Sequence, residues 1–394
     1  MSTSLYLSLS VLMFLEYAIW GAWMPVLAAR LLGPLKMSGK QTGWIYATIP
    51  LACIVSPLVA GLLADKWVNT ELIIGVAHII GAILMFIAAS QRKFAGLFVV
   101  MLLYSLCFAA TLPLVNSMMF RQLAEKGLDA GKISPTIFIW APIAWALAGY
   151  FLTGCRWIFK TGEQGRDCLY FAAILSVIMA VSCFFMPETK PTQSGTAPIL
   201  KAMQMLSDTN FLIFMVLSMI AAGMMQFYFL GTAQFMQDMG ISSKNVPASM
   251  AIAQVVQAAA TLLILGLMID KVGFKWTLVI GTVCWSLLYI AYVAEKPRWL
   301  IVGSQSMHGI AYVLFIIAGQ IFANAVAPED IRGSMQALIF AATTGIGLFL
   351  GTHLAGVTMD KFKKDDKFQW RPIFVVPCLI MLACTLGFIL LFKG

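Results

Sequence analysis

Long runs of apolar residues, separated by short polar connections, fill almost the whole chain. The runs do not alternate apolar and polar positions as a half-buried strand would, and each is about 20 residues or longer, which is the length that an α-helix needs to cross a bilayer. The pattern predicts twelve transmembrane helices, over residues 5–32, 41–64, 70–90, 95–120, 134–154, 168–187, 209–236, 246–269, 275–294, 299–326, 333–358 and 370–392.

The composition leads to the same fold class. Hydrophobic residues make up 61% of the 394 positions and charged residues only 11%, whereas a soluble domain averages about 25% charged residues. Since lipid offers no partner to a backbone polar group, every such group must be satisfied within the protein, which favours helices. We therefore expect an all-α membrane protein. Its net charge of +9 lies in the connections, where it meets lipid headgroups rather than nucleic acid.

The chain contains an internal repeat. Residues 61–66 read Gly-Leu-Leu-Ala-Asp-Lys, and 205 positions later residues 266–271 read Gly-Leu-Met-Ile-Asp-Lys. A linker over residues 190–205, which contains Pro191, Ser194, Gly195 and Pro198, separates six predicted spans from six. We expect two related six-helix bundles, over residues 1–189 and 206–394, that rock about a site between them, as in a transporter.

The two loop signatures, the twelve spans and the central linker together resemble the major facilitator superfamily. Other stretches resemble the bacterial nucleoside:proton symporters, namely residues 14–23, 77–83, 112–117, 139–140 and 327–336. The resemblance implies a major facilitator fold and alternating access, with a nucleoside as the leading substrate and proton symport as the leading coupling. It also implies a protein that works as a monomer in the bacterial inner membrane without a cofactor.

The orientation in the membrane is predicted differently by two rules. The resemblance places the loop between spans 2 and 3, the linker and both termini in the cytoplasm. More than half of the 26 lysines and arginines lie in the odd-numbered connections, which the positive-inside rule would put in the cytoplasm instead. We follow the loop signature, because it occurs at equivalent places in both halves.

The chain departs from the symporter pattern at four positions. The symporters have an arginine, a glutamate and an aspartate in spans 5, 8 and 10, where this chain has Phe138, Gln257 and Val313. A glutamine of their first helix is Glu16 here. Three ionisable positions are thus lost and one is gained.

Glu16 is the only acidic residue that the pattern places deep inside a span. An unpaired charge in a membrane costs roughly several kcal/mol, so such residues usually face a cavity and serve function. We expect Glu16 to carry a proton, with His78 as a second candidate because histidine titrates near neutral pH. The alternatives are a structural hydrogen bond for Glu16 and simple packing for His78, His308 and His353.

The expected substrate site combines one carboxylate, aromatic rings and amides. Trp20 lies four residues after Glu16, on the same helix face, where a flat ring can stack on a base. Amides can bond ribose hydroxyls and base edges, and apolar rings can form walls. The candidate binding residues are Glu16, Trp20, Asn116, Phe138, Gln226, Gln254, Gln257 and Tyr312. Helix-to-helix hydrogen bonds and interfacial aromatics would explain the same residues.

The repeated loops predict a gating latch. Asp65 and Lys66 recur as Asp270 and Lys271 at helix ends in both halves, and a carboxylate there can cap helix N-termini and pair with basic side chains. The alternative is a set of solvated loop charges.

Other functions stay open at this point. The chain could be a major facilitator for a sugar or an organic cation, a uniporter, or a membrane receptor or scaffold without flux. An enzyme is not expected, because no catalytic set of paired carboxylates or of nucleophile and base has useful spacing, and no metal-binding Cys/His spacing occurs. Cys155 and Cys168 flank one external loop and are candidates for a disulfide.

Overall fold

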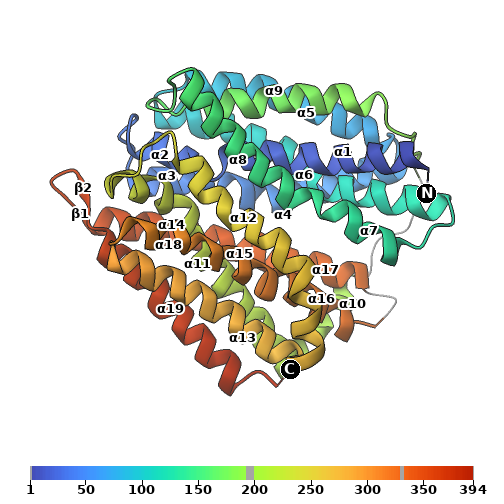
Figure 1. The fold of residues 1–394 in the computed structure, drawn as a ribbon. Helices are drawn as coiled ribbons and strands as arrows, with labels where there is room; N and C mark the ends of the chain where they lie inside the picture. The colour runs from blue at the N-terminus through green and yellow to red at the C-terminus, as the bar shows by residue number, and fades with distance from the viewer. Residues whose placement is uncertain (1, 192–198, 329–331, 394) are drawn as a thin grey trace. The chain divides into compact units, whose positions relative to one another are not determined.

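The computed structural model describes residues 2–191, 199–328 and 332–393, and the side chains of Asp65 and of residues 130–132, 199–201 and 332–334 lie outside this description. Helices make up nearly all of it (Figure 1). The first half contains α1 (Thr3–Trp23), α2 (Leu27–Leu32), α3 (Gly39–Tyr46), α4 (Thr48–Lys66), α5 (Thr70–Ser90), α6 (Phe94–Glu125), α7 (Ala130–Phe138), α8 (Trp140–Ile158) and α9 (Asp167–Cys183).

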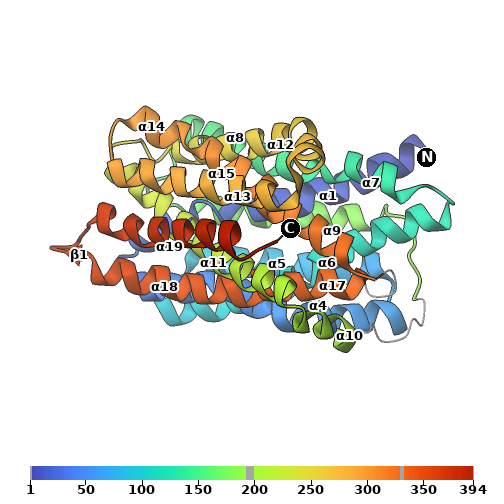
Figure 2. The ribbon, with the colours of Figure 1, turned by 90° about the horizontal axis from the view of Figure 1, so that it is seen from below.

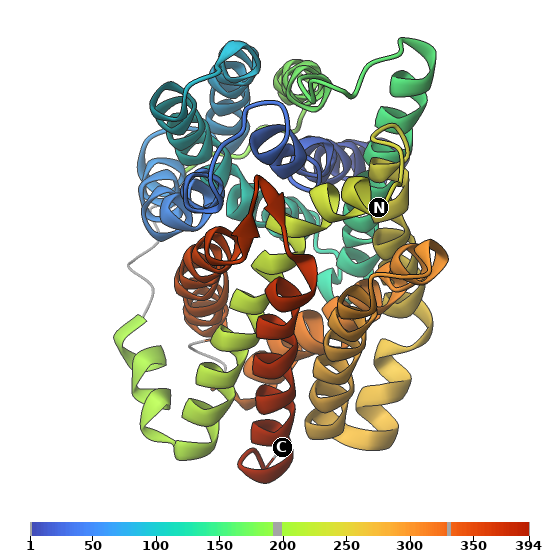
Figure 3. The same ribbon diagram turned by 90° about the vertical axis from the view of Figure 1, so that its left-hand side faces the viewer.

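The second half has the same character. It contains α10 (Ile199–Gln204), η1 (Met205–Ser207), α11 (Thr209–Asp238), α12 (Val246–Leu263), α13 (Leu265–Ala294), α14 (Arg298–Gly303), α15 (Gln305–Ala311), η2 (Tyr312–Ile317), α16 (Ala318–Val326), α17 (Arg332–Phe340), η4 (Ala341–Gly347), α18 (Leu348–Lys361), β1 (Lys363–Lys364), β2 (Lys367–Phe368) and α19 (Trp370–Leu390). The strands β1 and β2 form a hairpin between α18 and α19 (Figure 3).

These helices account for the twelve predicted spans. Within the described residues, eleven segments are long and apolar enough to cross a membrane, and α9, with 17 residues, supplies the remaining span. Several spans are broken. Gly273 interrupts α13 with φ 76° and ψ 172°, a backbone conformation that glycine adopts without strain. Pro25 follows α1, and a proline there cannot continue the hydrogen bonds of the helix.

Apolar side chains on the outside of the helices have the exposure expected of a lipid-facing surface. Leu58 is 70% exposed and Phe185 is 78% exposed. In water such side chains would be a liability, but in a bilayer they contact acyl chains and need no cover.

By its internal packing the chain divides into two units. Unit 1 comprises Met1–Met37, Leu51–Gly195 and Ser243–Ala251, and unit 2 comprises Ser38–Pro50, Thr196–Ser242 and Ile252–Gly394. In unit 1, α5 packs on α6 and α9, and α1 packs on α8 and α9. In unit 2, α11 packs on both α18 and α19 (Figure 2), and α13 packs on α19. The division at residues 189 and 206 stays a prediction.

Two short segments pack with the unit formed mainly by the other half of the chain. They are Ser38–Pro50 and Ser243–Ala251. Ser38 and Ser243 are 205 positions apart, which is also the separation of the two loop signatures. The internal repeat of the sequence therefore reappears as a repeat in packing.

The segment Ser38–Pro50 is held on α18 by close backbone packing and by a carboxylate. A side chain at Gly39 would collide with the carbonyl oxygen of Gly356, so the two helices can approach only because both residues are glycines. Asp360 accepts hydrogen bonds from the backbone N–H groups of Gly39 at 2.5 Å and Lys40 at 2.9 Å. These groups open α3, where a negative charge is favourable.

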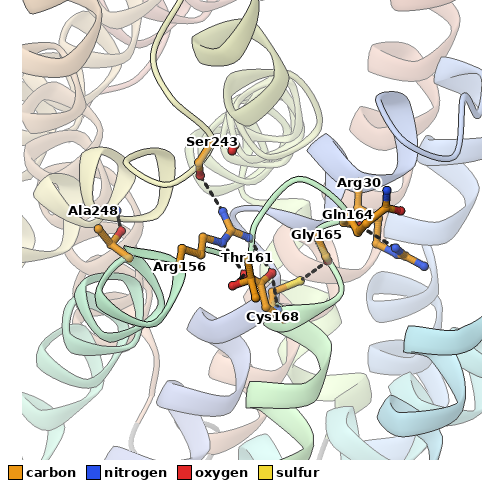
Figure 4. A network of polar contacts seen from close by, with 10 residues as sticks. Arg30, Arg156, Thr161, Gln164, Gly165, Cys168, Ser243 and Ala248 are labelled. Atoms are coloured by element: carbon orange, nitrogen blue, oxygen red, sulfur yellow. Dashed lines mark hydrogen bonds and ion pairs between the residues drawn. The ribbon is translucent and has the colours of Figure 1, made fainter. Parts of the chain in front are cut away.

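Arg156 holds the segment Ser243–Ala251 within unit 1 (Figure 4). Its Nε and Nη2 donate to the two carboxylate oxygens of Asp167 at 2.7 and 2.9 Å, and its Nη1 donates to the Ser243 carbonyl at 2.8 Å. A second tie runs from the Ala248 N–H to the Thr153 hydroxyl at 3.0 Å. Arg156 is only 3% exposed, so its charge is used inside the fold.

The disulfide expected between Cys155 and Cys168 is absent, because both residues are free thiols. The Cys168 thiol instead donates to the Gly165 carbonyl oxygen at 3.2 Å (Figure 4). A buried thiol with its own acceptor behaves as a small packing residue, and the candidate bridge does not form in this structure.

Candidate functional site

A buried polar cluster joins three helices of unit 1. Glu16 on α1 accepts a hydrogen bond from the Thr111 hydroxyl on α6, with 2.7 Å between Thr111 Oγ1 and Glu16 Oε1. The other carboxylate oxygen, Oε2, lies 3.0 Å from Nε2 of His78 on α5. Glu16 and Thr111 are 0% exposed and His78 is 2% exposed. Both candidates for proton transfer thus lie in direct contact.

The surroundings make this pair suited to holding one proton. In the described part of the chain, His78 is the only ion-pair partner of Glu16. With a proton the pair is neutral overall, whether the proton sits on the imidazole or on the carboxyl group; without it, the pair carries one negative charge. A buried charge without a counter-charge is costly, and this cost distinguishes the two charge states of the pair.

Trp20 lies in an aromatic group one turn along α1 from Glu16. Its ring centroid is 5.4 Å from that of Trp145 and 5.9 Å from that of Phe108. Its indole Nε1 is buried and has no hydrogen-bond partner. On α6, the side-chain oxygen of Asn116 is likewise buried without a partner. Two residues of unit 1 that were predicted to bind substrate therefore each have a buried polar atom without a partner among the described residues.

Gln226 on α11 is the most exceptional residue of unit 2. It is 0% exposed, and neither its Oε1 nor its Nε2 has a hydrogen-bond partner in the described part of the chain. A buried polar group left unpaired costs about 1–3 kcal/mol. Since this amide forms no hydrogen bond with any described residue, the alternative role as a bond between helices does not describe it. An amide kept at such a cost is free to bond a ligand.

The other predicted binding residues have less distinctive surroundings. Gln254 and Gln257 are each 8% exposed on α12, and Tyr312 is half-buried at the first residue of η2. Because η2 is a π-helix, it departs from regular helical hydrogen bonding, as π-bulges at functional sites often do. Phe138 is half-buried and lies 6.1 Å from Phe120, between ring centroids.

The sequence profile of the nucleoside H⁺ symporters matches residues 1–394. The chain therefore belongs to the nucleoside H⁺ symporter family. It is 26% identical to the nucleoside permease NupG of Escherichia coli (strain K12), over 99% of this chain and 96% of the permease. It is 28% identical to the putative nucleoside transporter YegT of the same organism, over 98% of this chain and 93% of that protein.

The solved structure of the nucleoside transporter NupG has the same fold. The two align with a TM-score of 0.87 at 25% identity, over 99% of each chain. The predicted fold class, an all-α membrane protein of the major facilitator type, is confirmed. The prediction of a transporter rather than an enzyme is confirmed by the family.

The other histidines of this symporter have packing partners. The Nδ1 atom of His308 accepts a hydrogen bond from the Trp285 indole at 3.2 Å, and its ring stacks on Tyr228 at 3.9 Å. Since an indole can only donate, this nitrogen carries no proton. His353 lies 4.4 Å from Trp44, between ring centroids. Both environments match the packing alternative for these residues.

Three of the four predicted latch residues have described side chains. Lys66, Asp270 and Lys271 are exposed, and the described part of the chain shows no ion pair of theirs. The side chain of Asp65 lies outside the description, as do residues 329–331 of the stretch that precedes span 11 and the middle of the linker over 190–205.

Sequence reasoning missed Thr111, Arg156 and Asp360. A hydroxyl inside an apolar run gives no signal of its own, because threonine often bonds a carbonyl of its own helix. Arg156 and Asp360 are at helix ends, where charged residues are expected in any case. Only the folded chain shows which groups they contact.

Gln226 supports a prediction that separates ligand binding from structural bonding. Gln226→Met should raise the free energy of unfolding by about 1 kcal/mol, because it removes two unpaired buried polar atoms. It should also abolish the rise in melting temperature that a nucleoside gives, since only a ligand of the folded state stabilises it. Thermal melting of purified protein with and without a panel of ribonucleosides measures both effects.

Gln305 is the matched control for this substitution. It is also 0% exposed in unit 2, but its Nε2 donates to the Tyr292 hydroxyl at 2.6 Å and to the Ile301 carbonyl at 3.0 Å. Gln305→Met should destabilise the protein and keep the nucleoside effect. If Gln226→Met destabilises just as strongly and still responds to nucleosides, Gln226 is structural.

Proposed function

We propose that this family member moves nucleosides into the bacterial cell together with protons, and that the Glu16–His78 pair carries the proton. The observation that carries the proposal is the fully buried Glu16 carboxylate, bonded to Thr111 and His78 within unit 1. A charge at that depth is retained in a membrane protein chiefly when function needs it.

The proton site must differ from the one that the family resemblance implies. The acidic positions of spans 8 and 10 in the symporters are Gln257 and Val313 here, and neither side chain can bind a proton at physiological pH. Glu71, the other glutamate buried in a span of unit 1, lies in the first turn of α5, where it accepts from the Thr189 N–H at 3.0 Å. Glu16 and His78 are thus the groups available for coupling.

The proposed nucleoside contacts are aromatic rings and side-chain amides. In unit 1, the ring of Trp20 stacks on the base and Asn116 bonds the ribose or the base edge. In unit 2, Gln226 supplies both a donor and an acceptor from one amide. Gln254 and Gln257 add further amides, and Phe138 and Tyr312 form walls. The names of NupG and YegT support the nucleoside class.

Glu16 itself is better suited to the proton than to the nucleoside. Both of its oxygens are occupied within unit 1 and none of its surface is exposed. Its effect on the substrate is then indirect, through the helices that it joins. All of the proposed contacts belong to one chain, so a monomer suffices, with lipid on its apolar faces.

Glu16→Gln tests the proton proposal. One charge moved through the membrane potential supplies about 2.3 kcal/mol per 100 mV, which supports roughly a 50-fold solute gradient at about 1.4 kcal/mol per tenfold. The variant mimics the protonated carboxyl group and should lose uphill, pH-driven uptake of a labelled ribonucleoside into proteoliposomes. It should still exchange labelled for unlabelled nucleoside.

Glu71→Gln serves as the control, because it changes another buried glutamate of unit 1 whose acceptor role a glutamine oxygen can keep. It should retain pH-driven accumulation. Accumulation by Glu16→Gln against a gradient would place the proton site elsewhere. If wild-type uptake ignores a pH gradient altogether, the protein is a facilitator.

We also propose that both termini are cytoplasmic, as the loop signature implies. The excess of basic residues in the odd-numbered connections and at the span ends beside them is partly structural. Arg30 is 1% exposed and donates to the backbone carbonyls of Gln164, Ala89 and Gln91, and Arg156 is paired with Asp167. Buried and hydrogen-bonded arginines are therefore weaker evidence for membrane orientation than solvent-exposed basic residues in loops.

A cysteine at the exposed Lys190 position, in a variant without native cysteines, tests the orientation. We expect a membrane-impermeant thiol reagent to label it only after the cells are opened. Labelling of intact cells would place the linker outside and reverse the assignment.

The repeated loop signature is proposed to act as a latch in the transport cycle. Asp65→Asn should slow flux several-fold. Nucleoside affinity should change less, because Asp65 is at a helix end and is not one of the proposed binding residues. Asp270→Asn is the symmetry-related variant. Flux and binding are measured on the same preparations, and wild-type flux in both variants would show that these residues are only solvated loop charges.

A further inference from the structure

The Thr111 hydroxyl faces two acceptors at the same distance. Its Oγ1 lies 2.7 Å from Glu16 Oε1 and 2.7 Å from the backbone carbonyl oxygen of Phe108, three residues earlier on α6. A threonine hydroxyl has one hydrogen to donate. The two hydrogen bonds therefore exclude each other at any instant, and the balance between them depends on the two acceptors.

The charge on Glu16 decides which acceptor receives this hydrogen. A hydrogen bond to an ionised group is roughly twice as strong as one between neutral groups, so an ionised Glu16 holds the Thr111 hydrogen. When Glu16 takes up a proton, this advantage disappears, whichever oxygen is protonated. A protonated Oε1 would even become a donor toward Thr111. In either case the Thr111 hydrogen turns to Phe108.

A switch of the Thr111 hydrogen bond from Glu16 to Phe108 would occur close to a proline in α6. Pro113 lies two residues further along α6, where it lacks an N–H and leaves a backbone carbonyl without its helical partner. Hydrogen bonds from threonine to a preceding carbonyl tend to bend a helix. Asn116, a proposed nucleoside contact, follows Pro113 by three residues. A change at Thr111 is thus placed two residues before the proline of α6 and five residues before a proposed binding residue.

We propose that Thr111 is a positioning residue that reports the protonation of Glu16 to α6, and so links the proton to the nucleoside. The link rests on the proposed role of Glu16 as the proton carrier. Thr111 neither binds the proton nor touches the substrate. It acts through Glu16 on one side and through its hydrogen bond to the α6 backbone on the other.

The other groups around Glu16 do not replace this function. His78 from α5 contacts the opposite carboxylate oxygen. Tyr104 of α6 and Cys183 of α9 are titratable groups that interact electrostatically with Glu16. Tyr104 accepts a hydrogen bond from the Trp23 indole at 3.3 Å, which fixes it elsewhere. Among the described residues, only Thr111 combines a bond to Glu16 with a bond to the backbone of its own helix.

The test compares Thr111→Val, which keeps the shape and removes the hydroxyl, with Thr111→Ser, which keeps the hydroxyl. Uptake of the ribonucleoside that most raises the wild-type melting temperature is measured in proteoliposomes over a range of external pH. Without the hydroxyl the ionised carboxylate loses a hydrogen bond, so the pH of half-maximal uptake should rise by about one unit. Thr111→Ser should keep the wild-type midpoint.

Accumulation for a given pH gradient should also fall in Thr111→Val, while exchange of labelled for unlabelled nucleoside continues. Thr277→Val is the matched control, since Thr277 is equally buried and its hydroxyl bonds only the Gly273 carbonyl of its own helix, at 2.7 Å. It should leave the pH profile unchanged. Thr111→Ala removes the same hydroxyl with a smaller side chain and gives a second reading if the valine variant fails to fold.

The two proposals fail in different ways. If Glu16→Gln abolishes pH-driven uptake but Thr111→Val and Thr111→Ala keep the wild-type pH profile and accumulation, Thr111 does not report the proton. If Glu16→Gln retains the wild-type pH profile, the proton carrier has been misassigned, and the proposal for Thr111 falls with it.

Discussion

A carboxylate removed from water must be paired, hydrogen-bonded or protonated, and Glu16 meets this constraint in a protein whose solvent is lipid. Its two oxygens are satisfied by different helices, His78 on α5 and Thr111 on α6. The first span is thereby tied to the third and fourth through a group that can change its charge. Each change of protonation must alter at least one of these bonds, which is what a coupling site requires.

The rest of the scaffold allows such a small change to be transmitted. Close approach at glycines, such as Gly39 against Gly356, packs helices without intervening side chains. Asp360 holds the segment Ser38–Pro50, and Arg156 holds the segment Ser243–Ala251, which begins 205 residues later. Each segment packs in the unit formed mainly by the other half of the chain. Prolines and π-helical turns interrupt the spans. The helices thus combine close packing contacts with interruptions in their regular hydrogen bonding.

Much of the fold could be predicted from the sequence, because apolar run length is a direct consequence of bilayer thickness. The twelve spans follow from it, and Glu16 is conspicuous as an acid in an apolar run. The contact between Glu16 and His78 could not be predicted, since 62 residues separate them and only packing decides which faces meet. The lack of hydrogen-bond partners for the Gln226 amide could not be predicted either, because an amide in a span can equally bond a neighbouring helix or stay unpaired. The candidate disulfide between Cys155 and Cys168 does not form, because flanking one loop does not fix thiol geometry.

The central claim is that nucleoside and proton cross the membrane together in a chain that lacks the acidic positions of spans 8 and 10. Its most direct test is to load proteoliposomes with a pH-sensitive dye and add a ribonucleoside outside, at equal pH on both sides and with the membrane potential clamped at zero. The account predicts acidification of the lumen that begins with the nucleoside, scales with its uptake and is absent from Glu16→Gln. Nucleoside entry through the wild-type protein without any acidification would contradict it.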